Sequence, residues 1–154
     1  MEVKDVLSKD RIIFNLDSDT KEKAIVELSN ILMEQGFLLN KDEYIKAVLQ
    51  RENHSTTGIG NNIAIPHGKS NSVTKSAIVF AKTKKDIEWE SLDEKPVNLI
   101  FLLAISELDQ TNGHLRLLSQ IASKLMDDDI VLGLQKTQTA DEVIKIFNEG
   151  DIEL

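Results

Sequence analysis

Near its middle the chain reads VNLIFLLAI (residues 97–105), an almost continuously apolar segment. A strand with this pattern is buried on both faces, so we expect it at the centre of a sheet that other elements cover on each side. AIVFA (residues 77–81) predicts a second strand, and residues 87–89 predict a short edge strand. A turn at residues 91–96 would then lead into the central strand.

Upstream of these strands, the sequence predicts a strand followed by a capped helix. RIIFNL (residues 11–16) is β-prone, and the segment after it has apolar residues at helical spacing. Asp19 with Glu22 predicts a capping box at the start of this helix, and Gly36 suits the position just after its end.

Two further helices are predicted to flank the functional residues. Asn40 with Glu43 predicts the start of a helix that ends near Arg51. Residues 113–126 have the apolar spacing of one face of an amphipathic helix, which would place His114 in its first turn.

The end of the chain predicts two short helices, at residues 130–134 and 139–147. Thr139 with Glu142 forms a cap pair, and Gly150 is the expected stop. Because helices and strands alternate along the chain, the fold class is α/β or α+β, with a mixed β-sheet flanked by helices.

Composition limits the possible architectures and partners. The chain has 154 residues, 41% of them hydrophobic, so residues 1–154 are expected to form a single domain. The formal net charge is −8 and no Lys/Arg run exceeds two residues, which argues against a nucleic-acid partner. The chain has no cysteine, and its longest apolar run is too short to cross a bilayer, so we expect a cytoplasmic protein without membrane insertion.

The segment TGIGNNIAIPHG (residues 57–68) is the main candidate for a functional site. Pro66 favours an extended residue before it, so residues 63–65 are expected to form a short buried strand that delivers His67. The glycines and asparagines tolerate positive φ, so the loop could point backbone N–H groups at an anion. The alternative is an ordinary glycine-rich turn with a surface histidine.

Three histidines and Arg51 are the evident chemical groups of the chain. His54 lies in a polar stretch and is expected to be solvated, whereas His114 would feel the positive end of a helix dipole and favour a neutral ring. Arg51 offers donors suited to phosphate or to a surface ion pair. Together with His67 they fit phosphoryl transfer best, because the chain lacks a nucleophile-elbow serine, a zinc motif and a P-loop.

Three segments resemble one known family. They are residues 57–68, preceded by Arg51 and Glu52; the helix that begins at His114; and residues 89–105. Together these segments resemble the enzyme IIA domains, type 2 or fructose/mannitol family, of the bacterial phosphoenolpyruvate-dependent sugar phosphotransferase system. The resemblance covers essentially the whole chain.

The resemblance implies a phosphotransferase with a phosphohistidine intermediate and no metal or cofactor. His67 would accept a phosphoryl group from the phosphocarrier protein HPr and pass it to a cysteine of a separate enzyme IIB, in carbohydrate uptake of the fructose type. His114 and Arg51 would assist at the phosphoryl group, and the phosphoryl loop would comprise Thr57, Gly58, Gly60 and Gly68. The alternative is a regulatory enzyme IIA, as in the nitrogen branch, that controls a partner through its phosphorylation state.

The chain departs from the family pattern at Ser106, where proline is common, and at two loop positions where glycine is common. Asn62 occupies one and Glu94 the other. Asparagine adopts the left-handed conformation readily, so the loop of Asn62 is expected to keep its shape.

Overall fold

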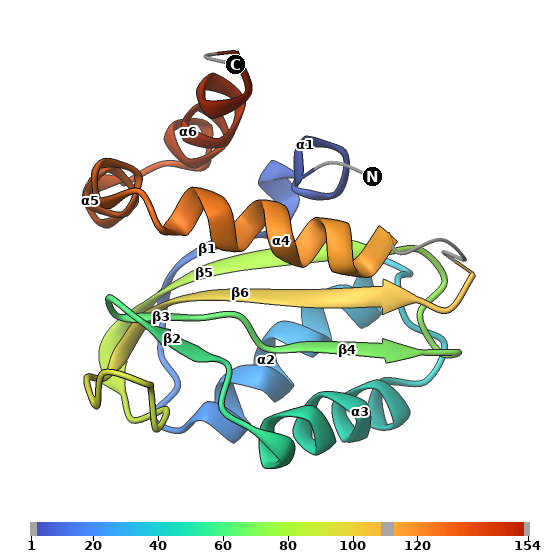
Figure 1. Ribbon diagram of the computed structural model, residues 1–154. Helices are drawn as coiled ribbons and strands as arrows, with labels where there is room; N and C mark the ends of the chain where they lie inside the picture. The colour runs from blue at the N-terminus through green and yellow to red at the C-terminus, as the bar shows by residue number, and fades with distance from the viewer. Residues whose placement is uncertain (1–2, 109–112, 153–154) are drawn as a thin grey trace.

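A computed structural model describes residues 3–108 and 113–152, and arranges their six strands in one mixed sheet (Figure 1). The strands are β1 (Ile12–Leu16), β2 (Gly58–Gly60), β3 (Ile63–Ala64), β4 (His67–Ser70), β5 (Ala77–Ile87) and β6 (Val97–Ser106). Their order is β1-β5-β6-β3-β2, and β4 also pairs with β6. β5 and β6 are antiparallel, whereas β1 is parallel to β5 and both β3 and β4 are parallel to β6.

Helices cover both faces of the sheet (Figure 1). α2 (Lys21–Glu34) and α3 (Lys41–His54) lie on one face. The other face carries α1 (Val3–Val6), α4 (Gly113–Leu125), α5 (Asp128–Lys136) and α6 (Ala140–Ile152). A 3₁₀ turn, Lys9–Arg11, leads into β1. The predicted α/β class, a mixed sheet flanked by helices, is confirmed. None of the helices in the described part of the chain is long and apolar enough to span a membrane.

The predicted central strand is confirmed as β6. Its side chains alternate between the two apolar cores, as the pleat of a strand requires. Leu102 and Ala104 pack with α2 and α3, whereas Leu103 and Ile105 pack with the helices on the opposite face. All four are at most 1% exposed, which is why the segment is apolar at nearly every position.

Several predicted helix ends are confirmed. Gly36 has a φ of 83°, and the N–H of Phe37 donates to Leu32 O at 2.9 Å, which closes α2 in a left-handed turn. Asn40 Oδ1 accepts from the N–H of Glu43 at 3.1 Å at the start of α3.

The cap pair at the start of α6 is confirmed as well. The N–H of Glu142 donates to Thr139 Oγ1 at 3.2 Å, and the Thr139 hydroxyl donates to Glu142 Oε1 at 3.1 Å. However, α6 continues to Ile152, so the expected stop at Gly150 is wrong. A single glycine weakens a helix without ending it where the following residues keep helical geometry.

The capping box predicted for α2 is wrong by one residue. Thr20 is the N-cap, and its hydroxyl accepts from the N–H of Lys23 at 3.1 Å. Asp19 instead forms an ion pair with Lys23 at 3.0 Å. Both residues are good caps, and sequence spacing alone does not choose between neighbours.

The separate edge strand predicted at residues 87–89 is also wrong. β5 runs without interruption to Ile87, and Trp89 lies fully buried after its end. The strand extends because residues 82–86, although polar, lie where the sheet meets solvent, so their polarity does not mark a turn.

Candidate functional site

The segment that delivers His67 forms two strands rather than one. β3 pairs Ile63 with Leu99 and Ala64 with Ile100, and β4 resumes the same register at His67 with Leu103. Pro66 interrupts the ladder because it has no N–H to donate, although its carbonyl still accepts from the N–H of Leu103 at 3.0 Å. The predicted short strand is therefore confirmed, and His67 begins the next strand instead of following a loop.

His67 projects from the sheet toward the face that α4 covers. Its partner across the ladder, Leu103, packs in one apolar cluster with Leu117 and Ile121 of α4. The next residue, Gly68, faces α3 on the opposite side, as strand alternation requires. The imidazole of His67 is half-buried, so the sheet holds the ring while part of it remains accessible.

The backbone selects one tautomer of His67. Its Nδ1 lies 3.0 Å from Ile65 O, which is an acceptor only. Nδ1 must therefore carry the proton in this hydrogen bond, and the neutral ring keeps its lone pair on Nε2. A histidine held in this way presents Nε2 as a nucleophile or base.

His114 lies in the first turn of α4, as predicted. α4 runs over the sheet face toward which His67 projects (Figure 1). The side chain of His114 lies outside the described residues, so its contact with a phosphoryl group stays a prediction.

Arg51 lies near the end of α3, and its guanidinium binds the chain just beyond the helix. Nη1 donates to Ser55 O at 2.7 Å and to Ser55 Oγ at 3.1 Å. These bonds satisfy carbonyl and hydroxyl groups at the helix end. His54, the last residue of α3, is exposed, as a solvated histidine would be.

The predicted phosphoryl-loop glycines each pack closely against a neighbouring element. A Cβ on Gly58 would lie 2.3 Å from Ser91 Oγ, and one on Gly60 would lie 3.3 Å from Asp93 Oδ2. A Cβ on Gly68 would lie 2.8 Å from Val48 Cγ2. Close packing accounts for Gly58 and Gly68, and a positive φ of 99° accounts for Gly60, so the role of these glycines at a phosphoryl group stays a prediction, as does that of Thr57.

The loop between β2 and β3 binds a carboxylate of the chain itself. The N–H of Asn61 donates to Asp93 Oδ2 at 3.1 Å, and the N–H of Lys95 donates to Asp93 Oδ1 at 3.1 Å. The bond from Lys95, followed by that from Asn61, lowers the pKa of Asp93 below its usual value. In the structure, the anion held by this predicted anion-binding loop is thus Asp93.

The two departures at glycine positions both have left-handed backbones. Asn62 has a φ of 67° and Glu94 a φ of 63°. Glycine reaches this region without a steric penalty, which explains why it suits both positions. Asn62 also donates from its side-chain amide to Pro96 O at 2.9 Å, which anchors the loop to the turn before β6.

A buried polar cluster that the sequence analysis did not identify adjoins the site. The carboxylate of Glu52 accepts from the hydroxyl and the N–H of Thr57, the latter at 3.3 Å, and from Trp89 Nε1 at 3.4 Å. One signal was available, because Glu52 follows Tyr44 and Val48 at intervals of four and so falls on the buried face of α3.

Tyr44 anchors α3 to the strand that supports His67. Its hydroxyl donates to Leu103 O at 2.8 Å, and the side chain is fully buried. Burial raises the pKa of Tyr44 well above its ordinary value, so the hydroxyl remains a donor.

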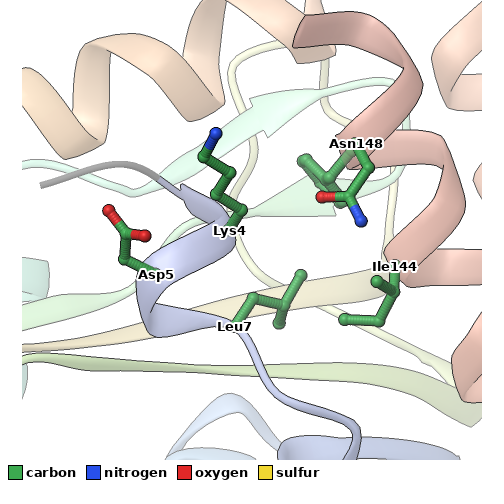
Figure 2. A pocket seen from close by; sticks show the side chains of 6 residues that line it. Lys4, Asp5, Leu7, Ile144 and Asn148 are labelled. Atoms are coloured by element: carbon green, nitrogen blue, oxygen red, sulfur yellow. The ribbon is translucent and has the colours of Figure 1, made fainter. Parts of the chain in front are cut away.

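A cavity elsewhere in the molecule contains none of the predicted site residues. It has a volume of about 280 Å³ and lies between α1 and α6. Figure 2 shows Leu7 and Ile144 across from one another in it, with Lys4 and Asn148 nearby. It is separate from the surroundings of His67.

Comparisons with known proteins identify the family of the chain. Residues 5–150 match the family described as "Phosphoenolpyruvate-dependent sugar phosphotransferase system, EIIA 2". The chain belongs to this enzyme IIA family and is a phosphotransferase component of that system.

Its relatives include both fructose-specific components and nitrogen regulatory proteins. The chain is 38% identical to the fructose-specific EIIABC component of Bacillus subtilis over 98% of its own length, but spans only 24% of that protein. It is 33% identical to the fructose-specific EIIA component of Haloferax volcanii, over 81% of this chain and 82% of that protein. It is also 33% identical to the nitrogen regulatory protein of Escherichia coli, over 98% of this chain and 92% of that protein.

The fold has solved counterparts. The nitrogen regulatory protein IIA-Ntr from Neisseria meningitidis matches with a TM-score of 0.86 and 29% identity, over 94% of this chain and 98% of that one. IIA mannitol from Escherichia coli matches with a TM-score of 0.77 at 24% identity, over 91% and 97%, and supports the fold alone.

Proposed function

We propose that this chain accepts a phosphoryl group on Nε2 of His67 from phosphorylated HPr and passes it to a cysteine of enzyme IIB. This phosphoryl transfer would take place in the cytoplasm, during carbohydrate uptake of the fructose type. The single observation that carries the proposal is the hydrogen bond between Nδ1 of His67 and Ile65 O at 3.0 Å, which leaves Nε2 as the nucleophilic nitrogen.

The phosphoryl transfer needs no general base, because Nε2 of His67 carries no proton. Nε2 of His67 attacks phosphorus as the bond between phosphorus and the donor imidazole breaks, and the donor ring leaves with the electron pair of that bond. The ring of His67 then carries a positive charge, because Nδ1 keeps its proton. The bond from Nδ1–H to Ile65 O supports this charged ring, so the geometry favours the phosphorylated state. In the next step a thiolate of enzyme IIB attacks phosphorus and the neutral ring is restored.

Charge on the phosphoryl oxygens needs cationic or donor groups around it. Arg51, on the helix that packs against β4, and His114, on the helix over the His67 face, are the candidates. Reaching the phosphoryl group would require Arg51 to exchange Ser55 for the phosphoryl oxygens. Thr57, Gly58, Gly60 and Gly68 would support the site by shaping the chain around it.

The partners follow from the family and from the composition of the chain. The 154 residues contain no cysteine, so the acceptor thiol belongs to an enzyme IIB unit outside them. A structure of similar fold is described as a complex of enzyme IIA of the mannitol system with phosphorylated enzyme IIB. The fructose-specific relatives favour a fructose-type sugar.

A regulatory role is the second candidate. The observation that favours it is the near-complete coverage of nitrogen regulatory proteins, 92% of the Escherichia coli protein. Both roles use the same phosphorylated histidine, so the chemistry is common to them and the downstream partner differs.

The test is incubation with phosphoenolpyruvate, enzyme I and HPr, followed by intact mass under conditions that preserve phosphohistidine. We expect one phosphoryl group on the wild type and none on His67→Ala. His54→Ala is the matched control, because His54 is an exposed histidine at the end of α3. It should be phosphorylated like the wild type.

Phosphorylation of His67→Ala, or loss of phosphorylation in the His54 variant alone, would refute the assignment of His67. To separate the two roles, phosphorylated protein is mixed with a fructose-type enzyme IIB. Transfer to the IIB cysteine supports transport, whereas no transfer from fully phosphorylated protein favours the regulatory candidate.

A further inference from the structure

Glu52 is a buried carboxylate to which the proposed chemistry assigns no role. It lies in the last turn of α3 and is 5% exposed. In the described part of the chain its carboxylate forms no ion pair. Taking a charged group out of water is costly unless hydrogen bonds compensate it. The donors that bind Glu52 therefore indicate which part of the structure it stabilises.

The donors to Glu52 come from the segment that leads to the reactive histidine. The N–H of Thr57 donates to Oε2 at 3.3 Å, and the Thr57 hydroxyl donates to Oε1. The indole of Trp89, which is fully buried, covers the pair and lies 3.3 Å from Thr57 Oγ1 through its Nε1. Thr57 is thereby held through both its backbone and its side chain.

From Thr57 the contacts continue to His67 through the backbone. Thr57 O accepts from the N–H of Ile65 at 3.0 Å. Ile65 O accepts from Nδ1 of His67 at 3.0 Å. Three successive hydrogen bonds thus connect the Glu52 carboxylate to the imidazole.

This connection matters because the Ile65 carbonyl selects the tautomer. Ile65 and Pro66 lie between β3 and β4, where the Pro66 carbonyl keeps a bond to the N–H of Leu103 but the N–H of Ile65 bonds outside that pairing, to Thr57 O. The bond from Ile65 N–H to Thr57 O is therefore a main constraint on the orientation of the carbonyl that faces His67.

We propose that Glu52 is a positioning residue for His67, acting through Thr57 and Ile65 to hold the carbonyl that keeps the proton on Nδ1. Its consequence for phosphoryl transfer rests on the proposed function above. Glu52 also follows Arg51 directly, so the same contacts fix the end of α3 from which Arg51 projects.

The first measurement uses the wild type and needs no activity. Nitrogen-15 NMR of the imidazole groups, with His67 assigned by comparison with His67→Ala, reports which ring nitrogen carries the proton. We expect the Nδ1–H tautomer to predominate when the ring of His67 is neutral. A predominant Nε2–H tautomer would overturn the inference.

The second measurement compares Glu52→Gln with the wild type. Glutamine keeps the size of the side chain but turns an NH₂ group toward donors, so the hold on Thr57 weakens. We expect a mixture of tautomers at His67 and a rate of phosphoryl acceptance lower by about tenfold, by analogy with the lower end of what loss of a hydrogen-bond partner costs at metal-bound histidines.

Glu88→Gln is the matched control, because Glu88 Oε1 accepts a backbone N–H, that of Glu90 at 3.0 Å, at an exposed position. It should change neither readout. Fluorescence of Trp89, the only tryptophan, reports whether the variants keep the buried cluster.

The outcomes separate the inference from the proposed function. A folded Glu52→Gln variant with an unchanged tautomer and rate would refute positioning, whereas a purely structural role would lower stability without moving the tautomer. If the variant does not fold, Thr57→Val, which removes the hydroxyl that donates to Glu52, is compared with the wild type by the same two readouts, and an unchanged tautomer and rate would refute positioning. A wild type that is never phosphorylated would refute the proposed function, and the tautomer data would still test Glu52.

Discussion

Gly68→Ala is the substitution that most directly tests how α3 packs against the strand carrying His67. At Gly68 the backbone of β4 packs directly against Val48 and Tyr44 of α3. A Cβ there would lie 2.8 Å from Val48 Cγ2, 3.1 Å from Val48 N and 3.4 Å from Tyr44 Cε1. The φ of Gly68 is not positive, so alanine would suffer from the contact and not from its own backbone.

The size of the effect follows from these distances. Carbon atoms in contact favour separations of about 3.5–4.0 Å, so the Val48 methyl must move by roughly 0.7 Å or more. Because Val48 N belongs to the helix backbone, α3 itself must shift. Overpacking of this kind costs about 1–3 kcal/mol, and 2 kcal/mol corresponds to a fall in Tm of about 4–8 °C for a domain of this size. The shift would also displace Arg51 and Glu52, so phosphoryl acceptance should slow.

Urea denaturation and thermal unfolding followed by circular dichroism measure the stability. Gly133→Ala is the control, because Gly133 lies inside α5 and its added Cβ would meet only the Ile146 side chain, at 3.3 Å. Alanine favours helix, so this variant should match or exceed the wild type. Val48→Ala makes room for the new methyl, so the double variant with Gly68→Ala should be more stable than the sum of the single effects predicts. Wild-type stability in Gly68→Ala, or strict additivity in the double variant, would refute the reasoning.

Three further substitutions test the local structure. Asn40→Ala removes the side-chain acceptor for the N–H of Glu43 and should lower the free energy of unfolding by about 1 kcal/mol in urea denaturation. Glu94→Gly relieves a left-handed φ worth about 1–2 kcal/mol while adding about 0.4–1 kcal/mol of unfolded-chain entropy, so thermal unfolding should show a net gain of about 0–1.6 kcal/mol. Asp93→Asn should destabilise the protein at neutral pH. Because the folded pKa of Asp93 is lowered from 3.8, the carboxylate's contribution is complete above that pH and lost as the pH falls through the folded pKa, so urea midpoints of the two proteins should converge in acid.

The centre of the fold could be predicted because it depends on burial. β6 is covered on both faces, which requires apolar residues at nearly every position and leaves an unmistakable pattern. The errors fell where two local signals compete. Asp19 and Thr20 are both good caps, and the polar residues that follow Ala81 continue the strand in space although they end its apolar run. Only tertiary contacts decide such cases.

The position of His67 could be predicted in part. Proline, histidine and glycine in succession indicated a ring delivered by a short strand, and in the structure that strand, β3, leads through Ile65 and Pro66 to His67 at the start of β4. The tautomer could not be predicted, because it depends on how the Ile65 carbonyl is oriented. That orientation is set by a hydrogen bond to Thr57, and sequence spacing does not reveal which backbone groups meet.

Glu52 shows how a functional carboxylate can be recognised before its partners are known. It continues the spacing of Tyr44 and Val48 on the buried face of α3, so a charge occupies a position where an apolar residue would extend the core. Leucine there would add apolar contact, but it would leave the N–H of Thr57 without its acceptor in a place that water does not reach. The carboxylate is thus explained by the loop it holds and not by the helix that carries it. Its partners lie 5 and 37 residues further along the chain, and only the folded protein brings all three together.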